Sequence, residues 1–235
     1  LKDFIRVVCG SEGGDNATLS DQVNVLGNHF GSYDFKLEYT MPNWKLAAYH
    51  QHYFEDKSGM IFVNGTDGLW GAQLDLPRLP WLKKVVTEYL VTRNQSGPFH
   101  FIIFDHDKYQ GPGDYYNNIE YITGSSYFGQ GIGSPLLTSP QYNTNGDIDF
   151  KNTRVRAWHL AFEGDLSPMV SYRLRYTLMN SWGKPYAPFL DNKRSNSGQV
   201  EVKYRHPRLQ GWEFTGAVAA DAGSLYEDNV GFSLS

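Results

Sequence analysis

The residues best suited to binding chemistry gather in one stretch of the sequence, GDYYNNIEYITGSSYFGQGIGSPL, at positions 113–136. Aromatic faces pack against the C–H surfaces of sugar rings, and amides and carboxylates hydrogen-bond to pairs of hydroxyl groups. The stretch therefore predicts a glycan-binding loop with these candidate residues: Asp114, Tyr115, Tyr116, Asn117, Asn118, Tyr121 and Tyr127. The alternative is that these residues fix the loop itself, because Asn and Asp bond to nearby backbone and Gly and Pro form turns.

Arginines on adjacent predicted strands form a second candidate group: Arg154, Arg156, Arg173 and Arg175. If these side chains face a water-filled lumen, they could contact an acidic polysaccharide through charge-assisted hydrogen bonds. The alternative is that they pair with carboxylates on neighbouring strands, such as Glu201 or Glu213.

Metal chemistry is suggested only by pairs of ligands. Side chains at i and i+2 of a strand share a face, so His50 with His52, or Asp105 with Asp107, could converge, and Asp147 with Asp149 could suit calcium. Two ligands make a weak site, and we expect no metal. The sequence also lacks nucleotide-binding, hydrolase and zinc-protease motifs, and we expect no cofactor. Carboxylate pairs for glycoside hydrolysis stay open, because such residues are distant in sequence.

The composition narrows the class of protein. Aromatic residues make up 15% of the chain and glycines number 24, which favours sheet and tight turns. The net charge of −4 is spread along the chain, so nothing indicates nucleic-acid binding. The single Cys9 excludes an internal disulfide framework. The chain has no run of 18 apolar residues and starts at Leu1, which we interpret as a processed or truncated chain.

The dominant hydrophobic period is two, the mark of a strand with one apolar and one wet face. It is clearest in YDFKLEYT, VSYRLRYTL, QVEVKYR and WEFTGAVAAD, which start at Tyr33, Val170, Gln199 and Trp212. Less regular strands are predicted at Asp3–Gly10, Gln22–Phe30, Trp44–Glu55, Met60–Val63, Gly68–Leu76, Trp81–Arg93, Phe99–Asp105, Arg154–Glu163 and Val230–Ser235. No helix is expected. Two long loops are predicted, a structured one at 108–152 and a second at 180–197.

The charged faces of these strands favour one architecture, an antiparallel transmembrane β-barrel with about 10–12 strands in this chain, as part of a larger barrel. In such a barrel the charged faces line a wet lumen while Tyr, Trp, Leu and Val meet lipid. Aromatics near predicted strand ends resemble interfacial girdles: Trp44, Trp70, Trp81, Trp182 and Trp212. The alternative is a soluble β-sandwich or jelly roll, since solvent-facing strands also carry charges.

Two segments resemble the Wzi-type capsule assembly family of Bacteroidetes outer-membrane proteins. The first match is GDYYNNIEYITGSSYFGQGIGSPL, with its Asp-x-x-Asn-Asn run, Gly124, Tyr127, and the closing Gly133, Pro135 and Leu136. The second is NTRVRAWHLAFEGDLSPMVSYRLRYTLMNSWGKPYAP, which carries Asn152, Arg154, Ala157, His159, Tyr172, Arg173, Asn180, Trp182 and Gly183. The matches extend over roughly residues 40–235. Departures are Ser125 where the family has Trp, Ser181 between Asn180 and Trp182, and a final Ser235 instead of an aromatic residue.

The resemblance implies a non-catalytic protein of the bacterial outer membrane that binds or organises capsular polysaccharide. Its expected partners are that polysaccharide, membrane lipid, and another chain or an N-terminal segment that completes the barrel. Two alternatives stay open. One is a soluble carbohydrate-binding or carbohydrate-active β-sandwich, and the other is a passive porin for small solutes.

Overall fold

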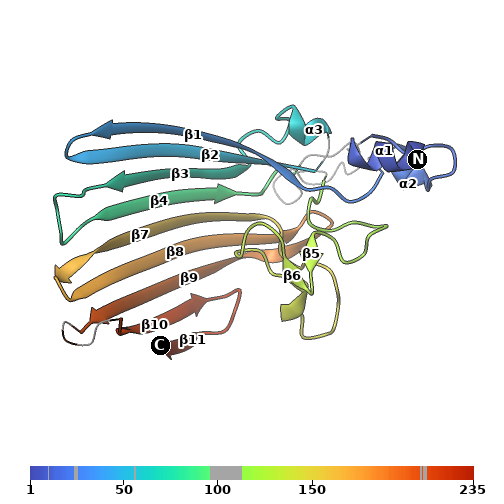
Figure 1. The fold of residues 1–235 in the computed structure, drawn as a ribbon. Helices are drawn as coiled ribbons and strands as arrows, with labels where there is room; N and C mark the ends of the chain where they lie inside the picture. Colours follow the sequence, from blue (N-terminus) through green and yellow to red (C-terminus); the bar gives the residue numbers. More distant parts are fainter. Residues whose placement is uncertain (10, 24–25, 56, 96–112, 207, 209–210) are drawn as a thin grey trace.

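In the computed structural model, which describes residues 1–9, 11–23, 26–55, 57–95, 113–206, 208 and 211–235, nine strands form one antiparallel sheet in the order β1-β2-β3-β4-β7-β8-β9-β10-β11 (Figure 1). The prediction of an all-β antiparallel chain is confirmed. The strands are β1 Gly31–Met41, β2 Trp44–Phe54, β3 Gly68–Asp75, β4 Lys84–Val91, β7 Val155–Ser167, β8 Val170–Lys184, β9 Ala187–Arg205, β10 Glu213–Gly223 and β11 Asn229–Leu234.

The two ends of the sheet differ. Short connections join β1 to β2, β3 to β4, β7 to β8 and β9 to β10 at one end, which we call the turn end (Figure 1, left). Residues 113–154, which precede β7 and which we call the long segment, lie at the other end, the loop end, and the N-terminal helices lie at this end too (Figure 1). Any site built by the long segment therefore sits at the loop end.

Three short helices replace strands expected from the sequence. They are α1 Lys2–Val8, α2 Leu19–Val23 and α3 Lys57–Met60, so the predictions of strands at Asp3–Gly10 and Met60–Val63 and of no helix are wrong. The described part of Gln22–Phe30 contains no strand, and Phe99–Asp105 lies outside the described residues. In α1, apolar Phe4, Ile5 and Val8 recur at helical rather than alternating spacing. No helix in the described ranges is long and apolar enough to cross a membrane.

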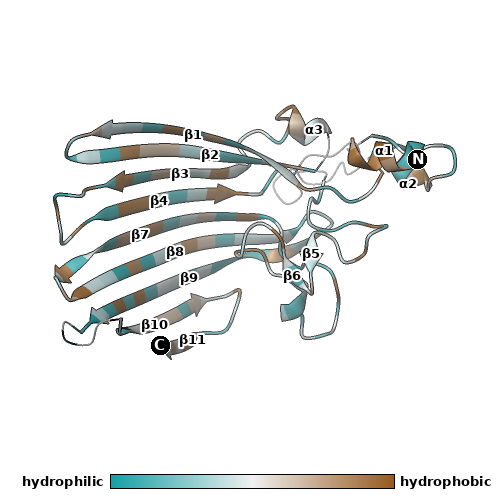
Figure 2. Ribbon diagram, in the orientation of Figure 1, coloured by the Kyte–Doolittle hydropathy of each residue, from teal (hydrophilic) through white to brown (hydrophobic). Residues whose placement is uncertain are grey.

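One face of the sheet, the apolar face, is hydrophobic across all nine strands. The strand register places Leu37, Leu46, Leu74, Val85, Phe162, Leu174, Val200, Val218 and Phe232 on it. Many of these side chains are exposed, and Phe232 keeps 83% of its surface accessible. Figure 2 shows the alternating hydrophobic and hydrophilic bands along the strands. The apolar side chains of this face are therefore not packed into an interior formed by the described residues.

The opposite face, the polar face, carries charges of alternating sign near the turn end. Across neighbouring strands from β1 to β9 the order is Glu38, Lys45, Asp75, Lys84, Glu163, Arg173 and Glu201. Arg173 lies 3.3 Å from both Glu163 and Glu201, and Lys84 lies 3.9 Å from both Asp75 and Glu163. We call this row the charge ladder. Each charge faces an opposite one across the strand pair, which favours this register over a slipped one.

The second predicted loop, at 180–197, is instead regular sheet. Strand β8 continues to Lys184 and β9 begins at Ala187, so only two residues separate them. A register shift between Ser181 and Gly183 bends the hairpin, and Gly183 has φ +77°, a conformation that favours glycine. Prolines and glycine marked the segment as a loop in the sequence, whereas here they shape a bulge and a tight turn.

The core lies between the long segment and the loop end of the polar face. Leu90, Val155, Ala157 and Met179 project from β4, β7 and β8 and pack against Tyr115, Tyr116, Leu137 and Phe150. The described residues 113–154 contain only two short strands, β5 Ser126–Tyr127 and β6 Gln130–Gly131, and the 3₁₀ turn η1 Pro140–Tyr142. Residues 108–112 of the predicted first loop lie outside the described residues. The segment thus covers the loop end of the polar face with an apolar interior.

Candidate functional site

Two tyrosines of the predicted binding loop anchor it to the sheet. Tyr115 and Tyr116 keep only 2% and 1% of their surface exposed, and the ring of Tyr116 packs against Phe30 and Phe150. Burial raises the pKa of Tyr116 well above its ordinary value. Neither ring is accessible to a ligand, so the structure supports the loop-fixing alternative for both.

Asp114 and Asn117 join two distant parts of the long segment. Asp114 accepts hydrogen bonds from the Tyr116 and Asn117 backbone and from Asn117 Nδ2, at 3.3, 3.4 and 2.9 Å. The Asn117 amide then donates to the Phe150 carbonyl and accepts from the Phe150 N–H, at 3.1 and 2.8 Å. Burial raises the pKa of Asp114 despite these donors. This two-way amide bridge fixes residues 147–151 beside residues 114–118.

Gly183 joins the β8–β9 hairpin to residues 152–154 at the end of the long segment. The Gly183 carbonyl accepts from the N–H groups of Thr153 and Arg154 at 3.1 and 3.0 Å, and its N–H donates to Asn152 at 3.1 Å. A Cβ on Gly183 would come within 2.9 Å of the Ala187 carbonyl oxygen, so the close approach requires glycine. The bulge thereby carries Lys184 and the turn residue Tyr186 to the long segment.

These contacts create a cavity of about 650 Å³ between the long segment and the hairpin, which we call the loop pocket. It is lined by Asp114, Asn117, Asn118, Ile119, Ile122, Asp147, Ile148, Asp149, Lys151, Lys184 and Tyr186. Three predicted binding residues, Asp114, Asn117 and Asn118, are therefore in its lining. Lys184 and Tyr186 were not among the candidates, because no spacing in the sequence connects the hairpin to the long segment. Lys151 lies on the long segment but was not a candidate either.

Ion pairs form the polar part of the loop pocket. Lys151 lies 2.8 Å from Asp149 and also contacts Asp147, while Lys184 pairs with Asp149. Burial opposes ionisation of Asp149, but its hydrogen bonds to Lys151 and Lys184 outweigh this and lower its pKa. Hydrogen bonds to Lys151 and Asn145 also lower the pKa of Asp147. Both carboxylates stay ionised at neutral pH.

The other aromatic candidates lie outside the loop pocket. Tyr127 is 71% exposed on β5 and its ring meets that of Phe128 edge-on at 4.6 Å between centroids, while Tyr121 is 42% exposed. Asn118 lies at the pocket but its Oδ1 accepts from the backbone of Glu120 and Tyr121. The structure therefore separates the predicted set into buried anchors, pocket-lining residues and exposed rings.

The four candidate arginines do not form one surface. Arg173 pairs with Glu163 and Glu201 in the charge ladder, and Arg175 bonds to Gln199 on the same face. Arg154 is buried, with Nη2 donating to the Trp182 carbonyl at 3.2 Å, and Arg156 projects from the apolar face, where register pairs it with Asn180. The structure therefore does not bring the four arginines together, because Arg173 and Arg175 project from the polar face, Arg156 projects from the apolar face and Arg154 is buried.

The candidate metal ligands have other roles. His52 is fully buried and bonds to the Gly59 carbonyl at 2.8 Å, while His50 bonds to the Leu69 carbonyl at 3.1 Å. Asp147 and Asp149 are paired with lysines. Asp105, His106 and Asp107 lie outside the described residues. Among the residues that are described, no three His, Cys, Asp or Glu side chains gather in an arrangement that could hold a metal.

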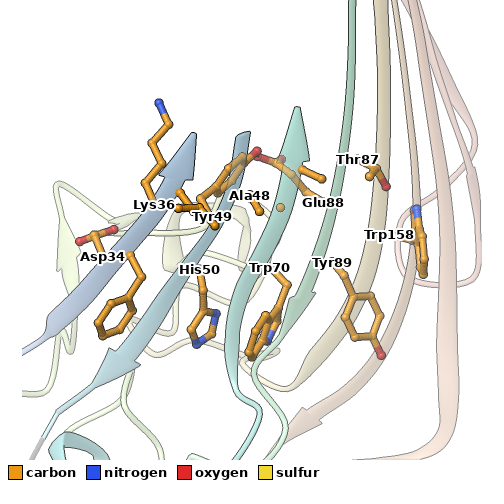
Figure 3. A pocket seen from close by; sticks show the side chains of 14 residues that line it. Asp34, Lys36, Ala48, Tyr49, His50, Trp70, Thr87, Glu88, Tyr89 and Trp158 are labelled. Atoms are coloured by element: carbon orange, nitrogen blue, oxygen red, sulfur yellow. The ribbon is translucent and has the colours of Figure 1, made fainter. Parts of the chain in front are cut away.

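A row of rings crosses the apolar face toward the loop end. His50, Trp70, Tyr89 and Trp158 lie side by side on β2, β3, β4 and β7 (Figure 3), with centroid distances of 3.7 Å for His50–Trp70 and 5.6 Å for Tyr89–Trp158. Tyr49 and Glu88 project from the other side and bond to each other at 2.5 Å. Small residues beside the row, such as Ala48 and Ala72, leave a shallow open depression.

Comparison of the chain with protein-family models, with curated proteins and with solved structures gives no match.

Proposed function

We propose that this chain forms part of the wall of an outer-membrane β-barrel of the Wzi capsule-assembly type. In this proposal the loop end presents a non-catalytic site that binds or organises surface polysaccharide. The observation that carries the proposal is the two-faced sheet, with apolar side chains exposed on eight of its nine strands and an ion-paired polar face behind them.

The apolar face has the character expected of a surface in contact with hydrocarbon. Soluble proteins rarely expose a contiguous apolar patch of more than a few hundred Å². On β8 the apolar positions run from Val170 to Leu178, eight steps of about 3.3 Å, or roughly 26 Å along the strand. With the usual tilt of barrel strands this approaches the apolar band of about 25 Å in outer-membrane barrels. The row of rings would then lie at the interface, where aromatic side chains are enriched.

The alternatives receive less support. A soluble sandwich buries its apolar face under a second sheet, and within the described residues the apolar face has no such cover. A passive porin needs an open lumen, whereas here the long segment packs on the loop end of the polar face through Tyr116, Leu137 and Phe150. A structured surface at the loop end suits binding better than conduction.

Membrane fractionation combined with capsule measurement tests the proposal. Cells that make the protein should yield it in the outer-membrane fraction, extractable only with detergent, and should keep more surface polysaccharide than cells lacking it. Recovery in the aqueous fraction without detergent would overturn the membrane assignment. Unchanged polysaccharide retention would overturn the capsule role alone.

A further inference from the structure

The loop pocket combines the two kinds of surface that a sugar ring requires. Tyr186 is 58% exposed at its rim, and the side chains of Ile119, Ile122 and Ile148 add apolar area. Aromatic and aliphatic surfaces pack against the C–H groups of a sugar. The Lys184–Asp149 and Lys151–Asp147 pairs add donors and acceptors to the same cavity.

Adjacent donors and acceptors match the hydroxyl groups of a carbohydrate. A lysine ammonium donates and a carboxylate accepts, so neighbouring hydroxyls of one sugar can accept from Lys184 and donate to Asp149 at the same time. The volume of about 650 Å³ falls within the range of small-molecule sites, about 300–1,000 Å³, which leaves room for one or a few sugar units.

The ion-paired charges of the loop pocket balance. Lys151 and Lys184 supply two positive charges, and Asp147 and Asp149 supply two negative ones. The remaining acid of the lining, Asp114, is buried, and its carboxylate accepts hydrogen bonds from Tyr116 and Asn117. An acidic sugar would have to displace Asp149 from its lysines or lie against an uncompensated carboxylate, and both arrangements are unfavourable. A neutral sugar disturbs neither ion pair.

We propose that the loop pocket binds an uncharged sugar unit of a surface polysaccharide, with Tyr186 packing against the ring and the Lys184–Asp149 pair bonding to its hydroxyls. This assignment rests on the proposed function and narrows it to neutral sugars. It also replaces the arginine-based recognition of an acidic polysaccharide.

The test uses the full chain in detergent micelles with the polysaccharide released from the surface of the native cells. Anion exchange separates this material into a neutral and an acidic fraction, and affinity for each is measured by calorimetry or surface plasmon resonance. The native chain should bind the neutral fraction more tightly. Tyr186→Ala should weaken that binding about tenfold, which corresponds to roughly 1.4 kcal/mol. Tyr186→Phe keeps the ring and should stay within about threefold of native, on the order of 0.6 kcal/mol.

Tyr142→Ala is the matched control, because Tyr142 is a tyrosine of similar exposure, 62% against 58% for Tyr186, on the long segment but outside the loop pocket. Its affinity should equal that of the native chain. Preferential binding of the acidic fraction, or equal losses in the two alanine variants, would overturn the loop-pocket assignment while leaving polysaccharide binding intact. Absence of binding to either fraction would overturn the proposed function as well.

Discussion

Arginine substitutions on opposite faces of β9 test the orientation of the sheet directly. Val200 projects from the apolar face, is 50% exposed, and pairs in register with Leu174 and Val218. Ser197 lies three residues earlier on the polar face, opposite Asp221. Val200→Arg and Ser197→Arg therefore place the same charge on the two sides of one strand.

Under the proposed membrane location the two faces meet different solvents, and the expected costs of the two substitutions therefore differ. At the middle of the apolar band, arginine destabilises an outer-membrane barrel by about 2–4 kcal/mol. Val200 stands four residues, or about 13 Å, from Tyr204 and equally far from Asn196, so the side chain cannot easily reach either aqueous interface. Ser197→Arg can pair with Asp221 and should change the stability by less than about 1 kcal/mol.

The free energy of unfolding is measured by guanidinium titration of the protein inserted in lipid vesicles, with tryptophan fluorescence as the signal. A loss of about 2–4 kcal/mol for Val200→Arg alone agrees with a lipid-facing residue. Surface substitutions in water usually stay within about 0.5 kcal/mol. If Val200→Arg changes the stability no more than Ser197→Arg does, the apolar face does not meet lipid and the membrane assignment fails.

Three further outcomes are expected. Asn117→Ala removes the bridge to Phe150 and should weaken the long segment by about 2–3 kcal/mol, seen as faster hydrogen exchange at Phe150 while the sheet amides stay protected. Burial raises the pKa of Asp67 to about 7. The contribution of Asp67 to the free energy of unfolding should therefore be greatest below the ordinary pKa of an aspartate and fall as pH rises through 7. Asp67→Asn should flatten that profile in denaturant titrations at pH 4 to 8. Arg173→Met leaves Glu163 and Glu201, which flank β8 on either side, without their shared cation and should cost about 1 kcal/mol of stability, relieved by adding Glu201→Gln; equal stability of both variants would contradict the charge ladder.

Strand periodicity was the most informative feature of the sequence. The segments starting at Tyr33, Val170 and Gln199 form β1, β8 and β9, because alternating side chains suit a sheet with two unlike faces. The prediction of a strand in the N-terminal segment was wrong, because the apolar residues of α1 follow a helical spacing and not an alternating one. Gly183 misled the prediction for 180–197, because one left-handed residue bends a strand without ending it.

The site was predicted only in part. Asp114, Asn117 and Asn118 of the predicted set line the loop pocket, but residue types could not separate aromatic rings that anchor the loop from rings that are accessible. Tyr116 and Tyr127 look alike in the sequence, and only packing against Phe150 buries the first. Lys184 and Tyr186 arrive through tertiary contacts of the β8–β9 hairpin, which no local pattern encodes.

The antiparallel order of the nine strands has a consequence for how a cylinder could be completed. Strands β1 and β11 occupy the two free edges of the sheet. They run in the same direction, because the seven strands between them alternate in direction. A seam directly between β1 and β11 would be parallel. A second copy with its loops on the same rim would also bring β1 of one copy beside β11 of the other in parallel. Antiparallel closure requires an odd number of added strands, and the total then becomes even, as in bacterial single-chain barrels.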